Sequence, residues 1–532
     1  METDSVIVRV VRVAKDVFAP GHLGGLTRYV PFELVDAVLE QCRAVERRRR
    51  VLPSRVGVYF LLALGLFPQV GYAGVWRKLA SGLGGTVVSE PSEKALRDVR
   101  RRIGIAPVKE LFETLAVPLA RPDMPGVSYR RWRTVAFDGC ASCKAPDSAA
   151  NRSWLGKIFH KPGWAGYPAL MLMTLAETGT RGLLGAVFGP AGTGETTYAT
   201  RLLHLLDEGM LLLADRGFDG NSFLRNVSGS GAQFLVRVSA GRRPPVHAKL
   251  PDGSYLSRFD TLTVRIIEAV ITVTCTDGRR VSGTYRLATS MLDHRTDPAG
   301  QLTRLYHERW EIESAYYALR HTLMNGRVLR STTPDGIAQE LWATLALYQV
   351  LRHAMAEAAE SQPGLDPDRI SFTTAMETAR DHLVTAHAVI TEETGPAPAF
   401  TRTLLASLLP PRRARTSSRK VKCPISRYHA KKDDGRPLTS INIATIEIAI
   451  HIPQTGPEPV PRPPVPRTAT LTGRILALLG THPTRHWRAR DIAHALHDAT
   501  PSTLRGQLRR LTHNGTLTSP TYGAYQLTPP TP

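Results

Sequence analysis

Three acidic residues that lie far apart in the chain are candidates for chemistry on phosphate esters. Asp138 ends the β-type run TVAFDG, and Asp215 ends the apolar run MLLLAD. Glu313 lies on a long amphipathic helix that we expect to begin near Pro298. Two carboxylates at strand ends and a third from a helix packed on the sheet supply the hard oxygen ligands that two Mg²⁺ ions need for in-line phosphoryl transfer. A single strand-end aspartate is more often a turn or cap residue, so only the combination indicates this chemistry.

The elements that must position these acids predict an α/β fold from about Arg133 onward. After the first strand, PALMLMTLAETGTRGLLGAVFGP predicts two strands joined by a turn at Gly179 to Gly182. Next come an amphipathic helix in TTYATRLLHLLDEG, a buried strand in MLLLADRGF, a helix in NSFLRNVSGS and a strand in AQFLVRVSA. In a ribonuclease-H-like mixed sheet with this order, the first and fourth strands are neighbours. The carboxylates of Asp138 and Asp215 would then converge.

The stretch from about Gly241 to Ser290 predicts a β-strand insertion into this fold. It contains TLTVRIIEAVITVTC and VSGTYRLAT on either side of a turn, and Asp277-Gly278 between β-branched runs is a good hairpin signal. Two helices follow, in AGQLTRLYHERWEIESAYYALRHTLM and in TPDGIAQELWATLALYQVLRHAM. The first of them carries Glu313.

The residues around Glu313 form a specific pattern. Tyr306, Arg309, Glu313 and Arg320 fit the spacing Y-x2-R-x3-E-x6-[KR], which in a regular helix places all four along one face. This pattern resembles the signature of the DDE transposases of the insertion-element-four family. FDGC, ADRGF and LYHERWEIE are similar, in order, to the blocks that carry the three acids of that family. The similarity extends from the N-terminal helical region to about Lys432, and it is most specific between Arg133 and Met355.

The resemblance implies roles for these residues. Asp138, Asp215 and Glu313 would be the metal ligands for two Mg²⁺ ions, which Mn²⁺ can replace, while Tyr306, Arg309 and Arg320 would hold phosphates of the transposon-end DNA. The family usually has Lys where this chain has Arg320, and a guanidinium differs from an ammonium in geometry.

It also implies an activity. The protein would bind the ends of an insertion sequence, hydrolyse the phosphodiester there and join the released 3′-OH to target DNA in cut-and-paste transposition. Family members with a β insertion can pass through a DNA hairpin. A homodimer or larger synaptic complex on DNA is expected, because two ends must be held together.

Two other functions remain open from the sequence alone. A metal-dependent nuclease of the same fold would cut without joining, and a domesticated, non-catalytic DNA-binding regulator would bind without cutting. The presence of all three acids argues against the regulator.

Composition agrees with a DNA partner. Lys and Arg number 68 against 46 Asp and Glu, a net charge of +22, which favours a polyanionic partner and nucleic acid over a membrane. The longest apolar run, Tyr59 to Phe67, is shorter than the ~20 residues that span a bilayer, and the N-terminus lacks the apolar core of a signal peptide. We therefore expect a cytoplasmic, nucleoid-associated protein. The C-x-x-C at Cys140 and Cys143 has no second ligand pair at zinc-finger spacing, so a metal role there is not favoured.

The chain divides into segments that differ in composition and in expected secondary structure. We expect a helical N-terminal DNA-binding domain (1–125), an α/β catalytic domain (126–400) with the β insertion at about 241–290, a basic C-terminal segment (401–455), a proline-rich linker (456–467) and a C-terminal winged helix-turn-helix (468–532).

Two of these segments offer basic helices for DNA. VWRKLASGL and SEPSEKALRDVRRRIG predict two short helices around a turn, the second capped by Ser92 and carrying Arg97 and Arg101 toward DNA; a solvated basic face is the alternative. In the winged unit, Ser502 to Arg510 would be the recognition helix, with Leu504, Leu508 and Leu511 on the core side and Arg505, Arg509 and Arg510 facing DNA. This unit either recognises the terminal inverted repeats or serves regulation or a partner.

The stretch GPAGTGETT, Gly189 to Thr197, comes within one residue of the phosphate-binding loop G-x-x-x-x-G-K-[ST]. Glu195 stands where the loop requires a lysine, which would place a carboxylate against the phosphates. We therefore expect no nucleotide site. The glycines favour a turn from the third strand into the following helix, with Glu195 at the positive start of that helix.

Overall fold

A computed structural model gives the protein two compact units, Met1–Ile452 and Pro453–Pro532. The structure describes residues 19–48, 50–84, 87–160, 163–387, 389, 398–411, 415–416, 435–437, 439–451, 471–483, 485–496, 501–519 and 524–528. The proline-rich stretch expected at 456–467 and most of the basic stretch before residue 435 lie outside these residues.

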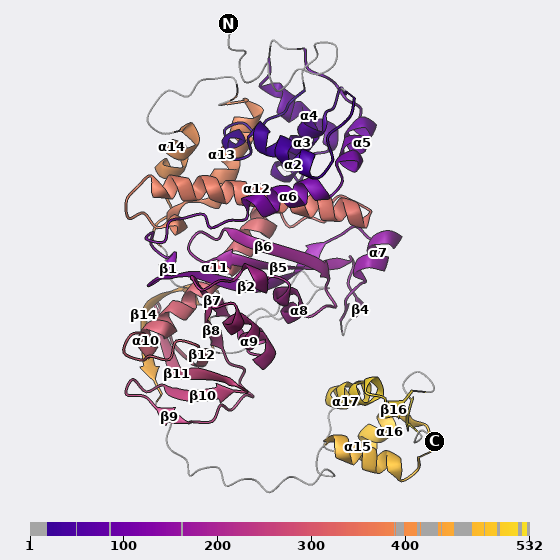
Figure 1. Ribbon diagram of the computed structural model, residues 1–532, viewed down its shortest axis with the longest axis vertical. Helices are drawn as coiled ribbons and strands as arrows, with labels where there is room; N and C mark the ends of the chain where they lie inside the picture. The colour runs from indigo at the N-terminus through magenta and orange to yellow at the C-terminus, as the bar shows by residue number, and fades with distance from the viewer. Residues whose placement is uncertain are drawn as a thin grey trace. The chain divides into compact units, whose positions relative to one another are not determined.

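The first unit begins with a layer of helices packed on one long central helix, α12 (Figure 1). Helix α12, Pro334–Glu360, buries side chains around its whole circumference, as expected for a helix enclosed by others. Trp342 contacts Phe112 on one side and Phe188 of the sheet on the other, with ring centroids 5.3 and 4.9 Å away. The helices of this layer are α2 (Phe32–Gln41), α3 (Ser54–Leu66), α4 (Tyr72–Ser81), α5 (Glu93–Ile103), α6 (Ala106–Leu115), α13 (Phe372–Val384) and α14 (Ala399–Ala406).

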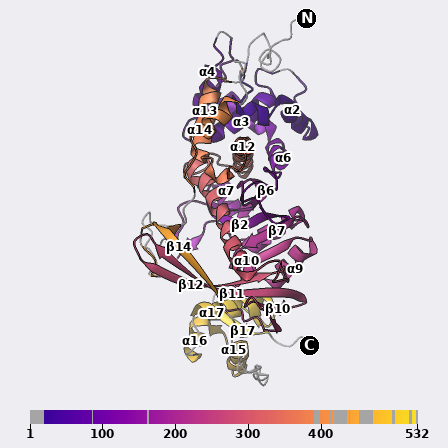
Figure 2. The same cartoon turned by 90° about the vertical axis from the view of Figure 1, so that its left-hand side faces the viewer.

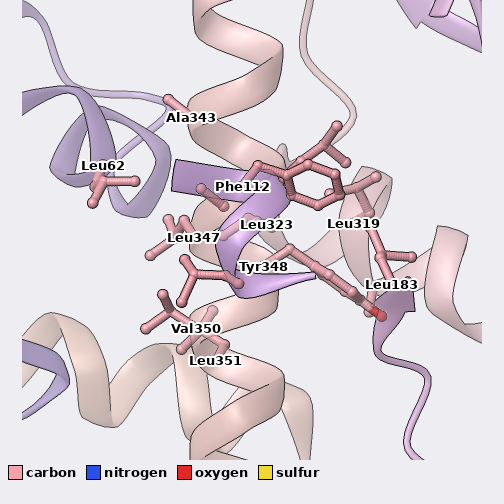
Figure 3. Packing of buried hydrophobic residues seen from close by; sticks show 14 of the residues in the cluster. Leu62, Phe112, Leu183, Leu319, Leu323, Ala343, Leu347, Tyr348, Val350 and Leu351 are labelled. Carbon is pink, nitrogen blue, oxygen red and sulfur yellow. The ribbon is translucent and has the colours of Figure 1, made fainter. Parts of the chain in front are cut away.

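Figure 3 shows part of the core that joins these helices to the sheet, with Leu62 of α3 and Phe112 of α6 beside Leu347 and Tyr348 of α12. The apolar run that was too short to span a bilayer is α3, which is almost entirely buried here. In the described part of the chain, no helix has the length and apolar character needed to cross a membrane.

The sheet beneath the helices has the strand order β6-β5-β2-β7-β8 in its central part. Strands β5 and β6 run antiparallel to their neighbours, whereas β7 pairs parallel with β2 and β8 parallel with β7. The expected order of elements and the expected pairing of the first and fourth strands are thus present. The elements are β2 (Trp132–Lys144), β5 (Ala169–Glu177), β6 (Leu183–Pro190), α8 (Glu195–Thr200), β7 (Met210–Ala214), α9 (Asn221–Gly229) and β8 (Gln233–Arg237), with β1 (Ser128–Tyr129) and α7 (Ala149–Leu155) at the margins.

The β insertion extends this sheet, because β12 pairs with β8. Its hairpin turns at Asp277-Gly278 as expected, and Gly278 has the positive φ of 83° that such a turn favours in glycine. Figure 2 shows β11 and β12 together with β14, a strand from much later in the chain that pairs with β11. The elements are β9 (Ala248–Lys249), β10 (Tyr255–Phe259), β11 (Leu262–Cys275), β12 (Arg280–Thr289) and β14 (Ile441–Ile450). Strand β14 was not expected, although INIATIEIAI alternates with a period of two.

Three elements differ from the sequence expectation. Strand β2 continues six residues past Asp138, because it keeps pairing with β5 after β7 has ended. Helix α8 stops at Thr200 and is followed by a 3₁₀ turn at Leu203–Leu205, which brings Leu202 and Leu205 against Gly185 of β6. The long helix after Pro298 is continuous but changes type: α10 (Ala299–Leu305), a 3₁₀ turn (Tyr306–Trp310), α11 (Glu311–Tyr317) and a π-helical turn (Ala318–Leu323).

The second unit has its own small core. Its helices are α15 (Leu471–Gly480), α16 (Ala489–Ala495) and α17 (Pro501–His513). Its short strands β15 (Trp487–Arg488), β16 (Leu517–Thr518) and β17 (Ala524–Leu527) form a sheet in the order β15-β17-β16. Leu504, Leu508 and Leu511 are buried on one side of α17, as expected from their spacing.

Candidate active site

The pairing of β2 with β7 sets the positions of the two aspartates. These strands are parallel and in register from Arg133↔Met210 to Ala136↔Leu213. Continuing that register by two residues places Asp138 opposite Asp215, directly after the end of β7. The sequence predicted that Asp138 ends a strand. In the structure Asp138 lies within β2, at the point where β7 ends and β2 keeps only β5 as a partner. The two aspartates are neighbours nonetheless, as predicted, because both lie at the end of β7, the shorter strand.

Two tyrosines fasten the Glu313-bearing segment to both aspartate strands. The Tyr306 hydroxyl donates to the carbonyl oxygen of Ala214, the residue before Asp215, at 3.1 Å. The Tyr316 hydroxyl donates to the carbonyl oxygen of Asp138 itself at 2.6 Å. Thr174, the β5 partner of Asp138, in turn donates to the Tyr316 oxygen at 3.0 Å. Because these hydrogen bonds are shielded from water, they fix the position of the helical segment over the two strands.

Arg309 lies among the acidic residues. Its side chain is 5% exposed, and its Nη2 forms an ion pair with Glu313 Oε1 at 3.5 Å. Burial works against its charge, but Tyr306, Asp215, Glu313 and Asp138 together raise the pKa of Arg309. Its Nε is buried and has no hydrogen-bond partner among the described residues. Glu313 is exposed, so the third acid is accessible from solvent.

Each of the two aspartates has a partly buried carboxyl group. Burial raises the pKa of Asp138 to about 7; the Gly139 N–H and Arg309 oppose the shift, and the carboxylates of Glu313 and Glu195 add to it. Asp215 Oδ1 is buried, and within the described ranges nothing donates a hydrogen bond to it. Carboxylate oxygens in such surroundings fit a divalent cation as ligands. In the described residues, however, no three Asp, Glu, His or Cys side chains gather around one point; Glu313 faces Arg309 instead.

The expected phosphate ligands differ in exposure. The 3₁₀ turn eclipses residues three apart, so Tyr306 and Arg309 lie on the same face, and both are buried, at 3% and 4% exposure. Arg320 follows on the π-helical turn and is half-buried. In the part of the chain that the structure describes, its guanidinium makes no hydrogen bond or ion pair.

The basic cluster on α5 is divided between solvent and core. Ser92 caps the helix as expected, accepting from the Ala95 N–H at 3.2 Å. Arg97 and Arg101 are exposed and pair with acids of the same helix, at 3.4 and 3.3 Å. Arg100 is buried, and its Nε donates to Gln339 of α12 at 3.1 Å. It therefore anchors α5 to α12, whereas its two neighbours remain available to a ligand.

In the second unit, Arg509 and Arg510 are exposed on the side of α17 away from the buried leucines. The side chain of Arg505 lies outside the described residues.

Sequence comparisons identify the family. The model of the insertion element 4 transposase N-terminal region matches residues 20–113, and the model of the transposase DDE domain matches residues 142–350. The chain belongs to the insertion element 4 family of DDE transposases. Asp215 and Glu313 of this transposase lie within the matched DDE region, and Asp138 lies four residues before it.

Two relatives come from Escherichia coli strain K12. The transposase is 27% identical over 365 residues to transposase InsG for insertion sequence element IS4, covering 66% of this chain and 80% of InsG. It is 24% identical over 204 residues to putative transposase InsZ, covering 38% of this chain and 67% of InsZ. Among solved structures, it is similar to the piggyBac transposase in a synaptic complex with hairpin DNA, with a TM-score of 0.36 and 10% identity over 68% of this chain and 78% of that chain.

Proposed function

We propose that this transposase binds the ends of an insertion sequence, hydrolyses the phosphodiester there with Asp138, Asp215 and Glu313, and joins the released 3′-OH to target DNA. The observation that carries the proposal is the β2–β7 register, which sets Asp138 opposite Asp215 beneath the segment that bears Glu313. The strand order and directions of the central sheet support a ribonuclease-H-like core.

Asp138 and Asp215 would hold divalent cations, with Glu313 as the third ligand once it leaves Arg309. The bound ions would supply charge neutralisation for in-line phosphoryl transfer. Tyr306 and Tyr316 hold the helical segment at a fixed height over the strands. Arg309 keeps the acids together in the unliganded protein, and its release from Glu313 would free both side chains.

DNA would be held by cations on several elements. Arg320, without a partner among the described residues, is the side chain in the signature that can receive a phosphate as it stands. Contacts from Tyr306 and Arg309 would require the 3₁₀ turn to rearrange when DNA binds, since both are buried. Arg97 and Arg101 of α5 would contact the DNA backbone, as would Arg505 and Arg509 of the second unit, which we assign as a winged helix-turn-helix. Two transposase molecules would hold two ends in a synaptic complex.

The test uses the full chain and duplexes taken from the DNA that flanks its gene, with Mg²⁺ or Mn²⁺. The unsubstituted chain should cleave the ends and join them to a target plasmid, and a hairpin product would identify the cleavage route. Glu313→Gln should abolish cleavage and retain end binding, because the exposed side chain keeps its size. Cleavage that survives this substitution would refute the assignment of the acids. Cut ends that never join would indicate a nuclease, and binding without cutting would indicate a regulator.

A further inference from the structure

The side chain of Glu195 lies beside the backbone that follows each aspartate. Glu195 begins α8, directly after the turn GPAGTG. A Cβ atom added to Gly139 would lie 3.0 Å from Glu195 Cγ, and one added to Gly217 would lie 3.8 Å from Glu195 Oε2. Gly139 follows Asp138 directly, and Gly217 comes two residues after Asp215. The Glu195 side chain therefore packs tightly over Gly139, and its carboxylate lies within van der Waals reach of the Gly217 position.

The start of α8 is held against the Asp215 loop. Thr196 Oγ1 donates to the carbonyl oxygen of Gly217 at 3.2 Å. One turn later, the Tyr198 hydroxyl donates to the carbonyl oxygen of Pro190 at 3.0 Å, and its ring is buried. Glu195 is thus attached to a fixed backbone, and the freedom that remains is that of its own side-chain torsions.

The carboxylate of Glu195 has no cationic partner. Within the described ranges it makes neither an ion pair nor a hydrogen bond, and it is exposed. A glutamate at a helix start gains a little stability from the helix dipole, and that gain does not require its side chain to approach Gly139. A Cβ atom added to Gly139 would also meet Met171 Sδ and Met173 Cε, both at 3.1 Å, so the Glu195 side chain packs over Gly139 together with these methionines.

We propose that Glu195 is a fourth acidic residue of the active site and that its carboxylate turns toward Asp138 and Asp215 to hold a divalent cation with them, because among the described residues these three side chains do not yet gather around one point. The inference rests on the proposed function, because it concerns the same cations. In the turn that resembled a phosphate-binding loop, the residue in the lysine position would then bind the metal and not the phosphate.

The test is Mn²⁺ binding by the full chain without DNA, measured by isothermal titration calorimetry. Glu195→Gln should weaken Mn²⁺ binding by about 10- to 100-fold, the usual effect of removing a group that supports a metal site. Glu195→Asp keeps the charge on a shorter side chain and should recover part of the affinity. Glu208→Gln is the matched control: Glu208 is an exposed carboxylate before β7, at the end of that strand opposite to Asp215, and its replacement should leave the affinity unchanged.

The outcomes separate the two proposals. The variants should unfold at the same temperature as the unsubstituted chain when no metal is present, because Glu195 is exposed. Equal Mn²⁺ affinity of Glu195→Gln and the unsubstituted chain would overturn the inference and leave the proposed function intact. An unsubstituted chain that binds no Mn²⁺, or Glu313→Gln protein that still cleaves DNA, would overturn the proposed function and the inference with it.

Discussion

Replacing Asp138 by Asn should stabilise the metal-free protein at alkaline pH. The pKa of Asp138 is raised from 3.8 to about 7, chiefly by burial, so the folded state favours the protonated carboxyl. The unfolded chain ionises near the ordinary value. The stability contributed by the neutral form is therefore complete below pH 3.8 and is lost as the pH rises through 7. Asn resembles the neutral form at every pH.

The magnitude follows from the size of that rise. At about 1.4 kcal/mol for each tenfold change in the ionisation constant, ionised Asp138 would cost the fold at most about 4 kcal/mol. Asp138 is partly exposed, and the Gly139 N–H donates to its Oδ1 at 2.8 Å. Solvent and this hydrogen bond both stabilise the ionised carboxylate, so the cost of ionisation is below the upper limit. We expect about half the upper limit, roughly 2 kcal/mol, as the amount by which the advantage of the variant grows between pH 4 and pH 8.

The assay is urea unfolding followed by circular dichroism at both pH values, with a chelator present. Asp123→Asn is the control, because Asp123 is exposed in the loop before β1. Other titrating groups are common to all three proteins and cancel in the differences. Mg²⁺ added at pH 8 should stabilise the unsubstituted chain more than the variant. A difference between Asp138→Asn and the unsubstituted chain that is the same at pH 4 and pH 8 would refute the reasoning that burial and neighbouring carboxylates act on Asp138.

Two further predictions concern the segment that carries Glu313. Tyr316→Phe removes the donor to the Asp138 carbonyl, so it should lower the free energy of unfolding by about 1–2 kcal/mol and reduce end cleavage. Tyr317→Phe is the control and should change neither quantity, because the Tyr317 side chain is 65% exposed. Equal cleavage by both variants would contradict the proposed positioning role of Tyr316. Arg320→Ala should weaken binding to end DNA and reduce the slope of log K against log salt by about 1, while Arg320→Lys keeps the slope; an Ala variant with an unchanged slope would show that Arg320 does not contact a phosphate.

Much of the site was predictable, because it depends on local patterns. The runs MLLLAD and TVAFDG indicate strands followed by an acid, and adjacent strands with this order of elements bring such acids together. The spacing around Glu313 indicated the family without any structure and predicted Glu313 as the third acid. Tyr316 was missed because a tyrosine three residues after the acid has no distinctive pattern; its role depends on a carbonyl of another strand.

Composition and the periods of two and of about 3.6 residues were enough to predict most of the elements, the charge of the partner and the types of side chain available for chemistry. The tertiary structure decided which of those side chains meet. The β2–β7 register fixed Asp138 opposite Asp215, and the 3₁₀ turn moved Tyr306 and Arg309 into the interior. It also brought Glu195 beside Gly139 and Gly217, which follow the two aspartates on other strands and loops. Such contacts depend on how segments far apart in the chain pair with one another, and the local sequence of each segment does not specify which distant residues will lie close to it.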